Sequence, residues 1–114
     1  MNKYNGQKRG DFIEMELNEL IDRISFIRTR ANLSARKLSM EIGKTESYIN
    51  RMEVAKNFAP AFETLNDILD VCNTSIEEFF YYSIPAFKQD RQIIELLKDI
   101  THDKKAAIIA LLKK

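Results

Sequence analysis

The sequence contains few of the residues that interrupt helices or cross-link a chain. Its 114 residues include three Gly, two Pro, one Cys and no Trp. Three glycines are too few for the many tight turns of an all-β sandwich or barrel, so helices are favoured. The single Cys72 excludes an internal disulfide and indicates a reducing compartment.

Long hydrophobic runs are also absent. The longest strictly apolar stretch, residues 106–112, is far shorter than the ~20 residues that span a membrane. The polar residues 1–10 lack the apolar region of a signal peptide. We therefore expect a soluble, cytoplasmic, all-α protein with no membrane-spanning segment.

The residues that usually carry catalysis or bind metals are scarce. Cys72 and His102 fall in separate expected elements without a third group to orient them, so a nucleophile and base pair is not supported. One Cys and one His cannot supply the three or four ligands of a zinc site. No phosphate-binding G-x-x-x-x-G-K loop is present. The sequence predicts no enzyme activity, no metal and no cofactor.

The net charge of +1 is unevenly distributed along the chain. Residues 23–57 hold eight basic and three acidic side chains, whereas residues 58–85 hold five acidic and no basic ones. A local basic face can attract phosphate because salt screens charges that lie beyond about 8–10 Å. The alternative is an ordinary solvated surface without a polyanionic partner.

Apolar residues recur at three- and four-residue steps, which is typical of helices. This spacing predicts a first helix that runs through residues 17–31. Ser34 is a good N-cap for a short second helix over residues 35–42. We expect Gly43 to end that helix with a positive φ angle.

The same spacing predicts three further helices before residue 83. Thr45 can cap a third helix that runs to about Val54. Pro60 suits the start of a fourth helix, because its fixed φ angle is helical. Ser75 and Glu78 form the pattern of a capping box at the start of a fifth.

The last third of the sequence predicts two amphipathic helices after Pro85. They cover residues 88–100 and 104–114, with a break and a new cap at residues 101–103. Their apolar stripes could pack back onto the domain, but we favour a dimer interface, because five helices already close one core. The stripes contain Ile93, Ile94, Leu96, Leu97, Ile100, Ile108, Ile109, Leu111 and Leu112.

The most informative stretch is residues 34–53, SARKLSMEIGKTESYINRME. It reads as two helices joined by a tight turn, each too short to be stable alone. Ser39 is small where the two backbones would approach, and Gly43 stands in the turn. The residues that fill the angle between the helices are Leu38, Ile42, Ile49 and Met52. This pattern is typical of a helix-turn-helix, whose second helix can enter the DNA major groove.

Several landmarks follow one another in a familiar order. They are IRTRANLSARKLS, the turn Gly43-Lys44-Thr45, SYINRME, Lys56, the P-x-x-E-T-L pattern from Pro60, and NTSIEEFF. With these landmarks, the stretch from Ile24 to Phe80, about half the chain, resembles the lambda-repressor and Cro-like helix-turn-helix family. This family is also called the xenobiotic-response-element family of bacterial and phage regulators.

The sequence predicts three regions. The polar residues 1–11 would be a flexible tail, the resemblance implies a five-helix DNA-binding domain over residues 12–83, and the apolar stripes favour a helical extension for dimerisation over residues 84–114. The protein would bind double-stranded DNA as a homodimer on an inverted-repeat operator, as a small transcriptional regulator and in particular a repressor.

The resemblance also implies roles for individual residues. Those expected to read base edges are Thr45, Glu46, Ser47, Asn50 and Arg51. Those expected to contact phosphates are Ser34, Arg36, Lys37, Lys44 and Lys56. Arg28 and Glu53 fall where the family places a buried salt bridge between its first and third helices. We expect Arg51 to bind guanine, against the alternative of a surface ion pair with a glutamate.

Three departures from the family pattern leave other functions open. Ala35 stands where a Gln often contacts the DNA backbone, and Lys44 stands where the turn usually has Val or Ile. Glu46 brings a negative charge towards DNA, although it could accept a hydrogen bond from a cytosine amino group. The alternatives are an antitoxin that binds a toxin protein, and a protein-interaction module that retains the fold without binding DNA.

Overall fold

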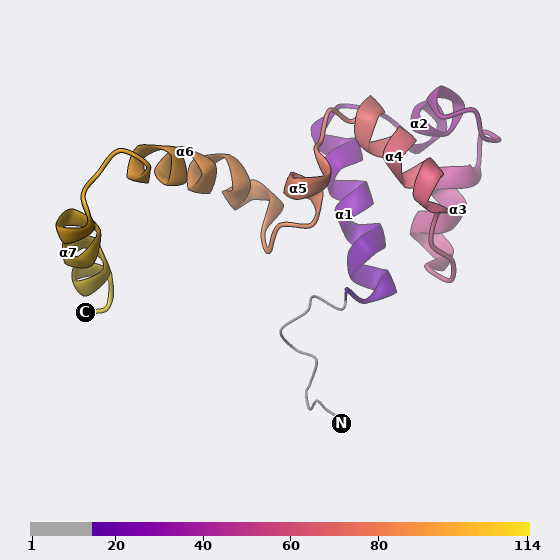
Figure 1. Ribbon diagram of the computed structural model, residues 1–114. Helices are drawn as coiled ribbons and strands as arrows, with labels where there is room; N and C mark the ends of the chain where they lie inside the picture. Colours follow the sequence, from indigo (N-terminus) through magenta and orange to yellow (C-terminus); the bar gives the residue numbers. More distant parts are fainter. Residues whose placement is uncertain (1–14) are drawn as a thin grey trace. The chain divides into compact units, whose positions relative to one another are not determined.

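The computed structural model describes residues 15–114, and every regular element in that range is helical (Figure 1). The prediction of an all-α protein is therefore confirmed. The chain divides into two compact units, the first ending at Phe79 and the second beginning at Phe80. The tail predicted for residues 1–11 lies outside the described residues.

The first helix, α1 (Leu17–Arg30), buries one face completely. Ile21, Ile24 and Ile27 recur at three-residue steps, and none of them is exposed to solvent. The helix ends where Asn32 takes a positive φ of 61°, a left-handed conformation that Asn tolerates.

The second helix, α2 (Ala35–Glu41), begins and ends as the sequence predicts. The Ser34 hydroxyl accepts a hydrogen bond from the Lys37 backbone N–H at 3.0 Å. Gly43 has a φ of 76°, and the N–H of Lys44 bonds the carbonyl of Ser39 at 2.9 Å. This Schellman arrangement satisfies the last carbonyls of the helix and requires the conformational freedom of Gly.

The third helix, α3 (Tyr48–Ala55), begins later than predicted. Ser47 occupies the N-cap position, and its side chain makes no capping bond. Thr45 is not the cap, because its carbonyl accepts from the Tyr48 N–H at 3.1 Å in a separate turn before the helix. At the other end, Lys56 closes the helix with a left-handed φ of 52°.

The fourth and fifth helices differ in detail from their predictions. Helix α4 (Phe62–Val71) begins after Ala61, so Pro60 precedes it instead of starting it. Helix α5 (Ile76–Phe79) is capped by Ser75, whose hydroxyl accepts from the Glu78 N–H at 3.1 Å. The Glu78 carboxylate does not complete a capping box, because it pairs with Arg30 of α1 at 2.8 Å.

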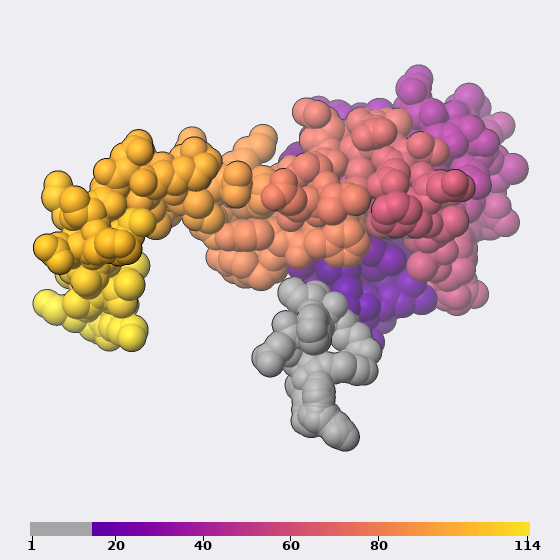
Figure 2. Space-filling view, viewed as in Figure 1, coloured from indigo at the N-terminus to yellow at the C-terminus, as the bar shows by residue number. Residues whose placement is uncertain are grey.

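The core of the first unit is formed by apolar side chains from all five of its helices. Figure 2 shows that these helices, which the ribbons of Figure 1 leave apart, form a continuous surface. The most deeply buried side chains are Ile21, Ile24, Ile27, Leu38, Ile49, Met52, Ile68 and Phe79.

The second unit contains a short 3₁₀ helix (Ile84–Ala86), α6 (Phe87–Leu97) and α7 (His102–Leu112). Helix α6 ends three residues before the predicted Ile100, because residues 98 and 99 turn. The break at Thr101 is confirmed, since its hydroxyl caps α7 by accepting from the Lys104 N–H at 3.2 Å. Neither α6 nor α7 contains a buried residue.

Candidate nucleic-acid interface

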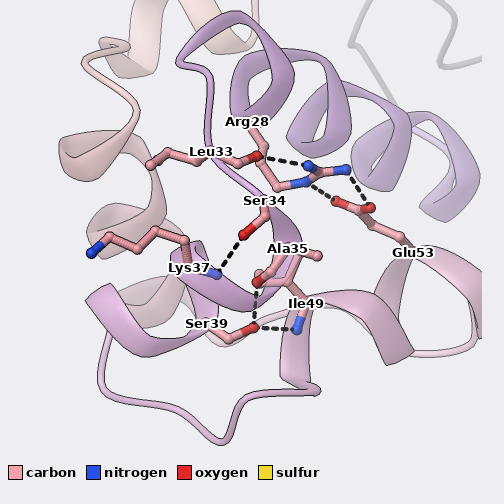
Figure 3. A network of polar contacts seen from close by, with 8 residues as sticks. All are labelled: Arg28, Leu33, Ser34, Ala35, Lys37, Ser39, Ile49 and Glu53. Atoms are coloured by element: carbon pink, nitrogen blue, oxygen red, sulfur yellow. Dashed lines mark hydrogen bonds and ion pairs between the residues drawn. The ribbon is translucent and has the colours of Figure 1, made fainter.

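The two helices of the helix-turn-helix are joined by a buried serine. Ser39 is completely buried, and its hydroxyl donates to the Ala35 carbonyl at 2.8 Å (Figure 3). The same oxygen accepts from the Ile49 N–H of α3 at 2.9 Å. A backbone N–H in the first turn of a helix has no partner within that helix, so this bond satisfies it and attaches α3 to α2. From the sequence we expected a small residue at position 39, where the two helix backbones approach, but the hydrogen bonds of Ser39 were not predicted.

A bidentate ion pair attaches α3 to α1. The Arg28 Nε and Nη2 atoms lie 2.8 and 2.9 Å from the two carboxylate oxygens of Glu53 (Figure 3). The remaining nitrogen of Arg28 donates to the Leu33 carbonyl, just before α2. The hydrogen bond with Glu53 raises the pKa of Arg28 above its ordinary value. The structure thus contains the pair that the resemblance implies, and it links all three helices around the turn.

The residues expected to read bases are presented by α3 and the turn before it. Thr45, Glu46 and Ser47 lie in the turn, whereas Asn50 and Arg51 lie in the first turn of the helix. All five side chains are exposed. The Arg51 Nη2 atom lies 3.3 Å from the Thr45 hydroxyl, so its neighbour is a hydroxyl and not a glutamate.

Two of the cations expected to contact phosphate pair with nearby carboxylates. Arg36, in the first turn of α2, donates through Nε to Glu46 at 2.5 Å. The Lys37 ammonium lies 3.2 Å from a carboxylate oxygen of Glu41, one turn further along the same helix. All four side chains are largely exposed, and exposed pairs contribute only about 0–1 kcal/mol. A phosphate can therefore displace either carboxylate at modest cost.

Lys44 and Lys56, the other two charged residues expected to contact phosphate, also have partners within the protein. The Lys56 ammonium lies 2.8 Å from a carboxylate oxygen of Asp22 on α1. The Lys44 ammonium lies over the ring of Tyr48, 5.3 Å from its centroid. Ser34 is engaged differently, since its hydroxyl caps α2. The sequence did not predict that Asp22 pairs with Lys56, because the two residues lie 34 positions apart and no local pattern connects them.

A shallow depression lies at the carboxyl end of α3, beside the expected base readers. Its lining residues are Asn50, Arg51, Val54, Ala55, Asn57 and Phe58. Val54 is 74% exposed although it is apolar. Sequence reasoning did not select it, but its spacing of three and four residues from Arg51 and Asn50 places it on their face of the helix.

Residues that could carry other chemistry are not gathered in a site. Cys72 is buried, and this burial raises the pKa of its thiol, which disfavours the reactive thiolate. Within residues 15–114, no three His, Cys, Asp or Glu side chains come together as metal ligands would. In the same range no helix has the length and apolar character needed to cross a membrane.

Comparison with known proteins identifies the family of the first unit. Residues 24–79 match the family model described as helix-turn-helix. No curated protein and no solved structure matches the chain. This part of the chain therefore belongs to the lambda-repressor and Cro-like helix-turn-helix family, whose domains bind DNA in transcription regulators.

Proposed function

We propose, from the membership of residues 24–79 in this family, that the protein is a transcriptional repressor that binds an inverted-repeat operator as a homodimer. In this proposal α3 enters the major groove, and the start of α2 faces the phosphate backbone. DNA binding in transcription regulation is the common function of the family; the repressor role and the homodimer are our inference.

The observation that carries the proposal is an exposed polar face on a rigidly held helix. The buried bonds of Ser39 and the Arg28–Glu53 pair fix α3 against α2 and α1. The side chains expected to read bases, among them Asn50 and Arg51, stay exposed on the outer face of α3. A reading helix must keep its orientation while its outer face stays free, and this arrangement meets both needs.

Within this proposal Arg51 is the principal base reader. Its guanidinium is exposed and can donate two hydrogen bonds to guanine, which discriminates by about 1–3 kcal/mol. Arg36, Lys37 and Lys56 would exchange their carboxylate partners for phosphates. Such an exchange releases counterions from DNA, so binding should weaken as salt concentration rises.

The direct test is a selection of genomic DNA fragments with the purified protein at two salt concentrations. We expect enrichment of a palindrome whose half-sites lie about 10 base pairs apart, with weaker recovery at higher salt. A folded protein that enriches no fragment at either concentration would contradict the proposal.

Substitution of the base reader then tests the site. Arg51→Ala should weaken binding to the selected sequence about tenfold or more, because it removes a bidentate contact. The control Arg91→Ala removes an exposed arginine from the second unit and should leave the affinity near that of the wild type. Both variants should keep the thermal midpoint of the wild type, and equal losses of affinity would argue against Arg51.

Dimerisation through the second unit is supported by its uncovered apolar surface. Exposed side chains on α6 and α7 include Ile93, Ile94, Leu96, Ile108, Ile109, Leu111 and Leu112. A second copy of the chain would cover them, and a two-fold axis could place two α3 helices about 34 Å apart, one turn of DNA.

The oligomeric state can be measured by sedimentation at micromolar concentration. We expect a dimer for the wild type and a monomer for Ile94→Lys, which puts a charge into the apolar surface of α6. Gln92→Lys, an exposed polar position on the same helix, should remain dimeric. A monomeric wild type would contradict this part of the proposal.

A protein-interaction module without DNA binding is the second candidate function. The pairing of Arg36, Lys37 and Lys56 with carboxylates favours it, because paired cations are less available to phosphate. A folded dimer that enriches no DNA fragment, with Arg51→Ala changing no interaction with nucleic acid, would support this candidate.

A further inference from the structure

One ion pair on the DNA-facing surface connects the two parts of the proposed interface. Arg36 lies at the start of α2, among the residues expected to meet phosphate. Glu46 lies in the turn before α3, among the residues expected to read bases. The two side chains are joined by a hydrogen bond although they are 67% and 65% exposed.

The other ion pairs on this surface do not make the same connection. Glu41 lies on α2 with its partner Lys37, and their (i, i+4) spacing keeps that pair within one helix. Asp22 lies on α1, so its bond with Lys56 joins two segments outside the base-reading turn. Glu46 is therefore the one carboxylate among these three that stands among the expected base readers.

The consequence for DNA binding depends on the bases that Glu46 meets. A carboxylate only accepts hydrogen bonds, and in the major groove the donors are the amino groups of cytosine and adenine. Where the groove presents guanine N7 and O6 or thymine O4, the carboxylate faces acceptors and is repelled. When DNA offers no hydrogen-bond donor to Glu46, the Glu46 carboxylate stays paired with Arg36. Arg36 is then not available to contact a phosphate.

We propose that Glu46 is a specificity-determining residue that acts partly through Arg36, a role that rests on the proposed DNA-binding function. On DNA of the wrong sequence, Glu46 keeps Arg36 paired and opposes binding. On the operator, an amino group of cytosine donates to Glu46, and Arg36 is released to a backbone phosphate. Base readout and backbone contact are thereby coupled through one exposed ion pair.

The experiment compares Glu46→Gln with the wild type on a random-sequence duplex and on the selected operator. Glu46→Gln should bind the random duplex about two- to fivefold more tightly at low salt, because it removes a weak competing pair. Its preference for the operator over the random duplex should fall. Its binding should also depend more steeply on salt, by about one further counterion, because Arg36 is freed for phosphate.

The matched control is Glu95→Gln in the second unit. Glu95 is 55% exposed and pairs with Lys98 at 3.0 Å, so its replacement changes the net charge by the same amount. We expect this variant to retain the operator preference of the wild type. If it lowers the preference as much as Glu46→Gln does, the effect is one of net charge and the proposal is overturned.

The role of Arg36 is tested by repeating Glu46→Gln in an Arg36→Gln background. In this background Glu46→Gln should no longer raise the affinity for the random duplex, because no Arg36 guanidinium remains to be released. A gain of equal size in both backgrounds, or none in either, would overturn the proposal. This comparison does not require an operator. If the selection enriches no sequence, the proposed function is contradicted, but binding to the random duplex still tests the coupling between Arg36 and Glu46.

Discussion

The two units of this protein have similar helical patterns and very different burial. In the first unit, Ile21, Ile24 and Ile27 recur along α1 and are completely buried. In the second, Ile93 and Ile94 of α6 are 51% and 41% exposed. The comparison teaches that apolar spacing predicts a helix and its apolar side but does not say what covers that side.

Helix α7 makes the same point more strongly. Residues 106–112 are all apolar, so apolar side chains lie around the whole circumference of its last two turns and not only on one face. Such a helix is ordinarily buried, yet none of its residues is buried here. The helices of the second unit therefore leave their apolar side chains exposed, whereas those of the first unit enclose a core.

The largest difference between the units should be seen when an isoleucine is truncated. Ile24→Ala should lower the free energy of unfolding of the first unit by about 2–5 kcal/mol, because it leaves a cavity in a packed core. Ile94→Ala, in the second unit, should change the free energy of unfolding of the first unit by less than about 0.5 kcal/mol, because the Ile94 side chain is not part of that core. Urea denaturation monitored by circular dichroism measures both losses, and similar values would contradict the contrast between a packed core and an exposed helix face.

A smaller difference should follow when a hydroxyl is removed from each unit. Ser39→Ala leaves the Ile49 N–H buried without its partner and should cost the first unit about 1–3 kcal/mol. Thr101→Ala removes an exposed cap of α7, so it should lower helicity in the second unit without changing unfolding of the first. If Ser39→Ala proves neutral in denaturation, the bond between α2 and α3 does not stabilise the turn.

The smallest effect concerns a pH-sensitive contact of the second unit. The Tyr81 hydroxyl donates to Asp90 at 2.6 Å, and this bond raises the pKa of Tyr81 from 10.0 to about 12. A raised folded-state pKa means that the contact stabilises fully below pH 10.0 and is lost as pH rises through about 12. Ultraviolet titration of tyrosinate should show a late step that Tyr81→Phe removes. A titration without such a step would show that Tyr81 ionises as an ordinary tyrosine.

The elements with local signals were predicted well from the sequence. Ser34 caps α2 and Gly43 ends it, because capping and positive φ depend on a few adjacent residues. The errors at Thr45 and Pro60 also concern helix starts. At both, a turn or an extended residue precedes the helix, and more than one nearby residue could have served as its start.

The candidate site was predicted in part. The expected base readers share one exposed segment, because they are consecutive or one turn apart in the chain. The partners of the expected phosphate contacts were not predicted: Lys56 and Asp22 are 34 residues apart, and Arg36 and Glu46 are 10 apart. Whether such residues meet depends on how separate helices pack, which no local pattern specifies.

The sequence by itself determined the helices, the turn at Gly43 and the identity of the exposed face of α3, since these follow from spacing, capping and backbone freedom. Apart from the Arg28–Glu53 pair, which the resemblance implied, only the tertiary structure decided which polar groups of different helices meet. Arg30 pairs with Glu78 across 48 residues, and Ser39 bonds the first turn of α3. Hydrogen bonds and ion pairs act over a few ångströms, so they form only where packing of the apolar faces brings distant residues together.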